Sequence, residues 1–203
     1  MPRTAFEQGS VGVRAVQTPS TELDIGFSGS FGSAAADNDA RRGLPNIGTL
    51  VEFGPRLRWK LGAAPWGGGL SAALPARGVF DINHRFRFRG VAAEPVLAWG
   101  DRSSSGWGYG ASIGLLLGDR RLADTFYGVA TADATATRAA YEAKAGLIAI
   151  RLAVNRSKRL STDWRLFGYA RVDSVAGAAN RRSPLVDRPT GASAGIGLAW
   201  IWL

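Results

Sequence analysis

The feature that most constrains this chain is the placement of its apolar side chains, which alternate with polar or small ones over most of its length. In residues 50–61, Val51 and Phe53 fall on one face while Glu52 and Arg56 fall on the other. A period of two is the geometry of a β-strand, whereas a helix repeats every 3.6 residues. The pattern therefore predicts an all-β fold built of half-polar strands.

The same alternation recurs in eight further segments. Strands are predicted over 11–16, 22–31, 50–61, 66–80, 85–99, 106–118, 146–156, 163–174 and 190–202. Most of these segments are about 10–13 residues long, although strands in soluble proteins average about 5–6 and a tilted membrane-crossing strand needs about 9–11. We therefore predict an antiparallel transmembrane β-barrel with eight or nine strands in this chain.

The connections between the predicted strands alternate between short and long. The short ones are 17–21, 62–65, 100–105 and 157–162, the long ones are 32–48, 119–145 and 175–189, and a further short one at 81–84 breaks the rule. Outer-membrane barrels have short periplasmic turns and longer outer loops. The alternation therefore indicates one barrel domain over residues 1–203, with three long outer loops.

The seven tryptophans all fall next to the short connections. They are Trp59, Trp66, Trp99, Trp107, Trp164, Trp200 and Trp202. Indole prefers the boundary between lipid headgroups and acyl chains, so a barrel gathers tryptophan into a girdle at the interface. The alternative is a set of core tryptophans that happen to lie at strand ends. We predict a girdle at the short-turn rim.

Charged residues follow the opposite phase of the strands, which in a barrel faces the interior. The predicted lumen charge network comprises Glu52, Arg56, Arg58, Lys60, Arg77, Glu94, Arg151, Arg165, Arg171 and Asp173. Opposite charges that fill a small barrel can neutralise one another, which favours a structural network. The same residues also fit a narrow anion-preferring pathway, so both interpretations stay open.

Several local features predict departures from regular strands. Pro55, Pro75 and Pro95 lie inside predicted strands, where proline removes a ladder donor, so we expect irregular pairing there. The apolar phase slips within 85–99, and a bulge at Gly90 would reset it.

The alanine-rich segment 129–144 predicts a short helix in the second long loop. Tyr127 and Tyr141 are candidates for packing that helix on the mouth of the barrel.

Composition excludes most enzyme chemistry. The chain has no cysteine and one histidine, His84, so thiolate chemistry and histidine-rich metal sites are ruled out. His84 lies in a predicted turn and is interpreted as a surface residue. Asp37 and Asp39 stand beside two arginines, which favours a solvated charge pair over a cation site. We predict no enzyme activity, no cofactor and no metal.

The net charge of +9 invites a nucleic-acid interpretation, but the arginines lie on the polar phase of the strands. We therefore expect no nucleic-acid partner. The sequence has no apolar run long enough for a transmembrane helix and no visible signal peptide.

An ordered set of motifs from about residue 20 to the end resembles the MltA-interacting protein (MipA/OmpV) family. The motifs are Asp37–Gly43 (DNDARRG), Glu52–Leu57 (EFGPRL), Asp124–Val129 (DTFYGV), Ala140–Tyr141 with Ala145–Gly146, and Ser183–Val186 (SPLV). The resemblance implies a Gram-negative outer-membrane barrel of 10–12 strands. It also implies a scaffold role linking a murein hydrolase to a murein synthase, with outer-membrane lipid as the other partner. Family members begin with a signal peptide and further strands, so we interpret residues 1–20 as the remnant of an upstream strand in a truncated or wrongly started frame.

Three functions stay open at this point. The first is a structural or scaffold protein whose partners dock on the periplasmic turns, including the basic run 156–159. The second is a narrow small-solute channel that prefers anions. The third is a soluble basic β-protein, which would have to stay dispersed without detergent.

Overall fold

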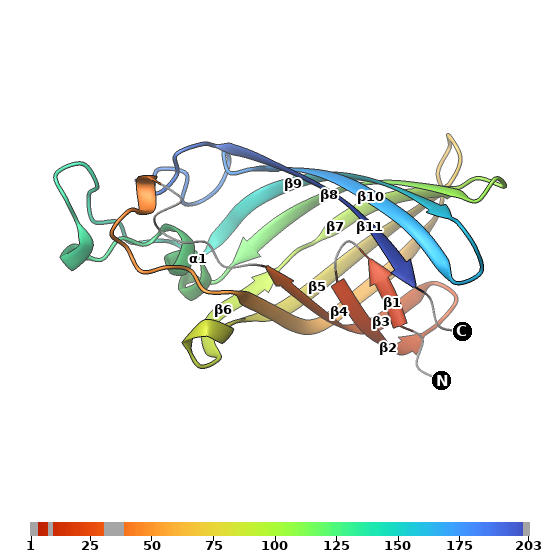
Figure 1. The fold of residues 1–203 in the computed structure, drawn as a ribbon, viewed down its shortest axis with the longest axis horizontal. Coiled ribbons are helices and arrows are strands. Elements are labelled where there is room, and N and C mark those ends of the chain that lie inside the picture. Colours follow the sequence, from red (N-terminus) through yellow and green to blue (C-terminus); the bar gives the residue numbers. More distant parts are fainter. Residues whose placement is uncertain (1–3, 8–9, 31–38, 201–203) are drawn as a thin grey trace.

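The structure is a computed structural model that describes residues 4–7, 10–30 and 39–200. Its strands form one antiparallel sheet in sequence order, except that β6 and β7 share the neighbours β5 and β8. The strands are β1 (Thr4–Glu7), β2 (Ser10–Gln17), β3 (Thr21–Ser30), β4 (Leu50–Ala63), β5 (Gly69–Asp81), β6 (Arg87–Ala93), β7 (Val96–Arg102), β8 (Trp107–Gly118), β9 (Gly146–Arg159), β10 (Trp164–Ser174) and β11 (Thr190–Trp200). Figure 1 shows the sheet curled on itself into a barrel. The predicted all-β antiparallel fold class is confirmed.

Each predicted strand corresponds to an observed one, but the predicted number of eight or nine is too low. The described residues form eleven strands. The four-residue β1 was missed because it is too short to show a period. The segment predicted as one strand over 85–99 is interrupted at Glu94 and Pro95, so it appears as β6 and β7. Residues 201 and 202 of the last predicted strand lie outside the described residues.

The predicted irregularities occur where proline and glycine lie. The ladder between β4 and β5 skips Gly54 and Pro55. Gly90 has a φ of +130° and sits at a register shift that leaves Arg89 without a cross-strand partner in the β5–β6 ladder. This is the predicted bulge, and it explains why the apolar phase of the sequence slips there.

The connections divide the barrel into two ends. We call the end with segments 39–49, 119–145 and 175–189 the long-loop end, and the end with turns 18–20, 64–68, 103–106 and 160–163 the short-turn end. The connection between β5 and β6 belongs to the long-loop end and contains the 3-10 helix η3 (Ile82–His84). Figure 1 shows the long segments gathered at one end together with the only α-helix of the described residues.

The predicted helix over 129–144 is wrong, because the α-helix α1 instead spans Arg120–Tyr127. Asp119 caps it by accepting a hydrogen bond from the Leu122 backbone nitrogen at 2.8 Å. The alanine-rich segment folds back on itself, with a bridge between Val129 and Tyr141 and only a 3-10 turn, η4 (Thr131–Asp133). Tertiary pairing of its backbone thus overrides the helix preference of alanine.

An apolar cluster lies beneath α1 at the long-loop end. Leu122 of α1 packs with residues of β4, β5, β6 and β9, and Leu116, Phe126 and Tyr127 border the cluster. The buried strand residues of this cluster are Leu50, Val79, Ala92, Ile148 and Ala149. Leu116 has the interior phase of its strand, and its contact with this cluster explains why that position is apolar. The helix therefore packs across one end of the barrel.

Candidate functional site

The barrel has its polarity inverted relative to a soluble protein. Large apolar side chains on the outward phase are exposed, as Phe27 (53%) and Phe53 (50%) show. Carboxylates on the inward phase are buried, as Asp24 (1%) and Glu94 (9%) show. Soluble proteins rarely expose so many contiguous apolar side chains or bury so many charges. The polar chemistry of this barrel is therefore concentrated in its interior.

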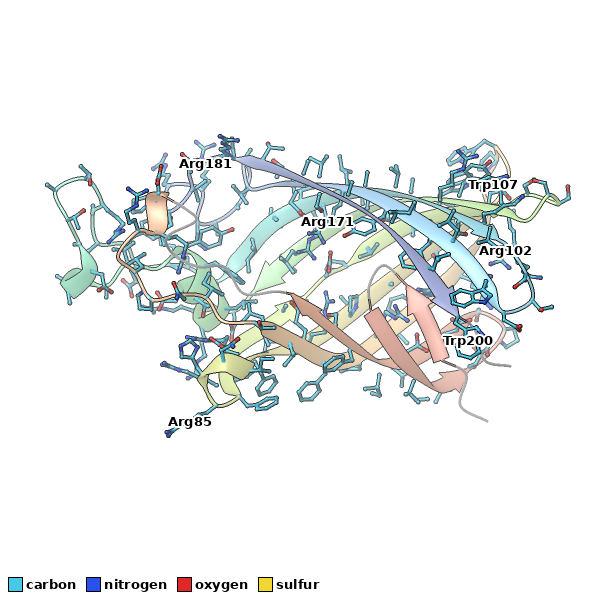
Figure 2. All side chains as sticks on the ribbon, in the orientation of Figure 1. Arg85, Arg102, Trp107, Arg171, Arg181 and Trp200 are labelled. Carbon is cyan, nitrogen blue, oxygen red and sulfur yellow. The ribbon has the colours of Figure 1, made fainter. Side chains whose placement is uncertain are left out.

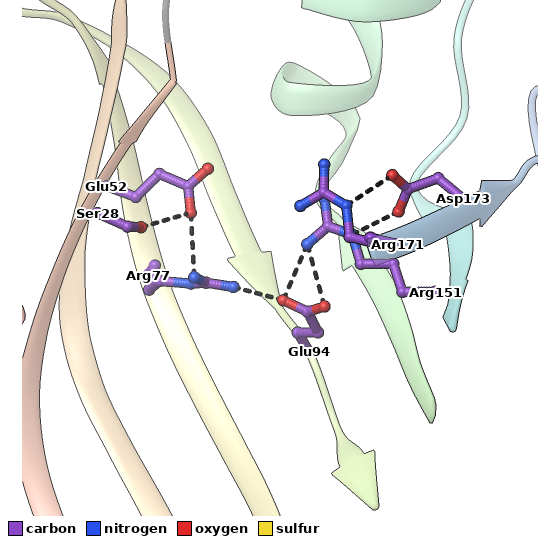
Figure 3. A network of polar contacts seen from close by, with 7 residues as sticks. All are labelled: Ser28, Glu52, Arg77, Glu94, Arg151, Arg171 and Asp173. Atoms are coloured by element: carbon purple, nitrogen blue, oxygen red, sulfur yellow. Dashed lines mark hydrogen bonds and ion pairs between the residues drawn. The ribbon is translucent and has the colours of Figure 1, made fainter. Parts of the chain in front are cut away.

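A continuous set of ion pairs crosses the interior (Figure 3). Arg77 of β5 contacts Glu52 of β4 at 3.3 Å and Glu94 at 2.6 Å. Arg151 of β9 lies 3.0 Å from Glu94 and 3.0 Å from Asp173 of β10. We call these residues, with Ser28 and Arg171, the central network. It joins opposite walls of the barrel.

The strand break between β6 and β7 positions the centre of this network. Pro95 has no backbone N–H to donate to a neighbouring strand. The backbone nitrogen of Glu94, the residue before it, donates to the Pro75 carbonyl at 3.0 Å. Glu94 thereby lies between two arginines and accepts from both. Arg171 and Ser28 extend the set at its two ends, at 2.9 Å from Asp173 and 3.4 Å from Glu52.

Two further ion pairs use acidic residues that the sequence prediction omitted. Arg56 contacts Asp24 at 2.7 Å, and Lys60 contacts Glu22 at 3.4 Å. Both acids lie on the polar phase of β3, so the alternation of the sequence was sufficient to predict that they face the interior. Arg58 is half-buried on the same face of β4. Six of the ten predicted residues belong to the central network, whereas Arg56, Arg58, Lys60 and Arg165 lie outside it.

Arg165 lies at the short-turn end with two other arginines. A cavity of about 410 Å³ is lined by Arg102 of β7, Arg159 of β9 and Arg165 of β10. The other lining residues are Ser103, Ser104, Ser105, Gly106, Gly108 and Ser157. We call this cavity the arginine pocket.

A second site missed by the sequence analysis lies at the long-loop end. Asp81 is fully buried and accepts from Arg89 at 2.5 Å, and its Oδ2 lies 2.8 Å from Nδ1 of His84. A Cβ on Gly48 would lie 2.0 Å from Asp81 Oδ1, so only glycine permits this approach. His84 is exposed, in line with its interpretation as a surface residue, and its contact with Asp81 was not foreseen from the sequence.

The three long segments are joined to one another by side chains. The Asn180 side chain bonds both the nitrogen and the carbonyl of Lys144, at 2.8 and 2.7 Å. Ser183 donates to the Tyr127 carbonyl at 2.7 Å, and Arg138 donates to the Arg42 carbonyl at 2.8 Å. Motifs far apart in sequence thus meet at one end of the barrel.

Both tyrosines predicted to pack at the barrel mouth contact apolar clusters there. Tyr127 borders the cluster beneath α1, and burial raises the pKa of its phenol. Tyr141 packs with Leu44, Val129 and Leu185. Asp39 pairs with Arg42, whereas Asp37 lies outside the described residues.

The six described tryptophans lie toward the short-turn end. Trp164 stacks on Trp200 with ring centroids 6.1 Å apart, and Figure 2 shows Trp107 and Trp200 at the same end. Trp99 donates to the Gly67 carbonyl in the turn that carries Trp66. Trp59 pairs with Thr21, directly after the first turn. Trp202 lies outside the described residues.

The basic run 156–159 is divided between two faces. Arg156 and Lys158 face outward and lie 4.0 and 4.9 Å from the ring centroid of Trp107. Ser157 and Arg159 instead line the arginine pocket. Alternation along β9 causes this division, because neighbouring side chains point to opposite faces.

Within the described residues there is no group of three acidic or histidine side chains that could hold a metal ion. No described helix is long and apolar enough to cross a membrane.

An antiparallel barrel with a paired, charged interior and an apolar exterior has the polarity typical of barrels that cross membranes. The sequence model of the family described as MltA-interacting protein MipA matches residues 3–202. The chain therefore belongs to this family. No curated protein and no solved structure gave a significant match.

Proposed function

We propose that this chain is a bacterial outer-membrane barrel that serves as a scaffold for a murein hydrolase and a murein synthase. The inverted polarity of the barrel carries the membrane part of the proposal. Family membership and the family's description as MltA-interacting support the scaffold part.

The central network and the cluster beneath α1 favour a structural role for the interior. Glu94 and its two arginines join facing walls, and Leu122 packs across the long-loop end. An interior occupied in this way suits a rigid platform that presents its turns to periplasmic partners. Trp66 (71% exposed) and Leu160 (56% exposed) are apolar side chains in those turns and offer anchors for a partner.

Membrane location is tested by fractionating cells and by gel migration with and without heating. We expect the protein in the outer-membrane fraction, with migration that changes on heating. A product that stays soluble without detergent would contradict the proposal and favour the basic soluble β-protein instead.

Scaffolding is tested by capturing a purified MltA-type murein hydrolase and a murein synthase on the folded barrel. The variant W66S/L160S should lose capture because it removes the exposed anchors. The charge variant R156Q/K158Q/R159Q tests the basic run separately, and R85Q/R181Q/R182Q removes the same charge at the long-loop end. Equal capture by wild type and both short-turn variants would exclude docking on these turns.

The alternative function is a narrow anion-preferring channel, and the arginine pocket is the observation in its favour. Three cations at one mouth would attract anions. The ion pairs and the apolar cluster described above oppose it. Planar-bilayer recordings distinguish the scaffold from the channel. The scaffold proposal predicts no stepwise conductance, whereas a channel would give conductance steps that are selective for anions.

A further inference from the structure

The arginine pocket differs from the rest of the barrel interior in having cations without acids. Arg56, Arg77 and Arg151 each contact a carboxylate at 3.3 Å or less. No described acidic residue forms an ion pair with Arg102, Arg159 or Arg165, and no acid lines the pocket. Arg165 lies close enough to the other two for their like charges to interact with it.

The local structure holds these cations together. Arg159 and Arg165 face each other across the β9–β10 ladder, and Arg102 ends β7 opposite Gly108. The side chains therefore converge from three of four neighbouring strands. Like charges on one face of a sheet are unfavourable, so an arrangement of this kind needs a counter-charge.

The other lining groups are hydrogen-bond donors suited to an oxyanion. The hydroxyls of Ser103 and Ser105 lie 2.9 Å apart in the turn after β7, and Ser157 adds a third hydroxyl from β9. A Cβ on Gly108 would lie 2.8 Å from the Ser157 oxygen, so glycine keeps this side of the pocket clear.

We propose that the arginine pocket binds a doubly charged phosphate group, either as a free ion or as the phosphate monoester headgroup of a lipid. Guanidinium groups match phosphate oxygens with paired hydrogen bonds, and serine hydroxyls complete the tetrahedral set. A monocarboxylate neutralises only one of three cations, whereas a phosphate dianion neutralises two. This site is independent of whether the barrel captures murein enzymes.

The first test measures inorganic phosphate binding to the folded barrel in a maltoside detergent, by phosphorus NMR and calorimetry at constant ionic strength. We expect saturable binding that acetate and chloride do not match. R102Q/R165Q should weaken it by roughly tenfold or more, because two charged hydrogen-bond donors are lost. R85Q/R182Q removes the same charge from exposed long-loop positions and should bind like wild type.

The second test identifies the source of the phosphate. The barrel is refolded into vesicles of phosphatidic acid, whose headgroup is a phosphate monoester, then extracted into maltoside and analysed for retained lipid phosphorus. Retention that R102Q/R165Q abolishes would assign the pocket to a headgroup, and free phosphate binding without retention would assign it to the ion.

Three outcomes would overturn the proposal. They are no phosphate bound in either test, equal binding of acetate, or equal binding by wild type and R102Q/R165Q. Heat-dependent gel migration confirms that each variant has folded, so a lost barrel is not mistaken for a lost site.

Discussion

The two ends of the barrel are built on different physical principles. At the long-loop end, α1 and three long segments pack on apolar strand residues and on one another. At the short-turn end the connections are brief, and the cavity between them is lined by arginines and serines. The central network has an acid for each of its arginines (Figure 3), and Figure 2 shows its Arg171 between the two ends.

The contrast indicates which parts of the barrel stabilise the fold and which part is suited to binding an anion. Apolar burial and paired charges stabilise a fold, whereas clustered like charges weaken it. The long-loop end and the centre should therefore be sensitive to substitution. The short-turn end should tolerate losing a charge and should gain from an anion.

The largest effect is expected at the centre of the network. Glu94→Gln leaves Arg77 with Glu52 and leaves Arg151 and Arg171 to share Asp173. The network then holds three arginines and two carboxylates, and one uncompensated buried charge costs about 3–5 kcal/mol. Reversible urea unfolding from lipid vesicles measures the loss. The control is Glu142→Gln in the exposed pair with Arg120, which should change stability by less than about 1 kcal/mol. Equal effects of the two variants would show that the network contributes no more than a surface pair.

The next effect is expected beneath α1. Leu122→Ala removes a side chain that is 2% exposed, and deleting a buried leucine costs about 2–4 kcal/mol. The same unfolding experiment measures it. Ala132→Gly, in an exposed turn of the same long segment, is the control. If Leu122→Ala left stability unchanged, the helix would not be anchored on the barrel.

A smaller effect is expected where the long segments join. Asn180→Ala leaves the nitrogen and carbonyl of Lys144 without their side-chain partner, at a cost of about 1–3 kcal/mol. Limited proteolysis should then cut within 119–145 faster than in wild type. Arg182→Ala, at an exposed position of the same segment, is the control. Unchanged cutting by both variants would refute the joining role of Asn180.

The smallest effect, and the only one of opposite sign, is expected in the arginine pocket. Arg165→Gln relieves repulsion with its two neighbours, so without phosphate it should leave stability unchanged or raise it by less than about 1 kcal/mol. Urea unfolding in chloride buffer measures this. A loss of stability as large as that caused by Glu94→Gln would contradict the proposed difference between the arginine pocket and the rest of the barrel.

Much of the fold followed from the alternation alone, because side chains of a strand point to opposite faces whatever the strand pairs with. The bulge at Gly90 and the irregular pairing at Pro55 were also foreseeable. The helix was misplaced because alanine content was weighed above a capping residue, and Asp119 stands directly before α1.

The partners within the site were not foreseeable from the chain. Glu94 and Arg151 lie 57 residues apart, and the strand order decides that they meet. Motifs such as Asp124–Val129 and Ser183–Val186 resembled a family as an ordered set along the chain. Only the fold brings them together, through bonds such as that from Ser183 to the Tyr127 carbonyl.

The sequence by itself determined which face of each strand is apolar, where most strands begin and end, and which connections are long. These properties are local, since they depend on the two-residue repeat and on proline and glycine in the backbone. The tertiary structure decided which charges are paired, that α1 packs across one end, and that Arg102, Arg159 and Arg165 share a cavity. Those outcomes depend on the pairing and register of strands that are distant in sequence, such as β8 with β9.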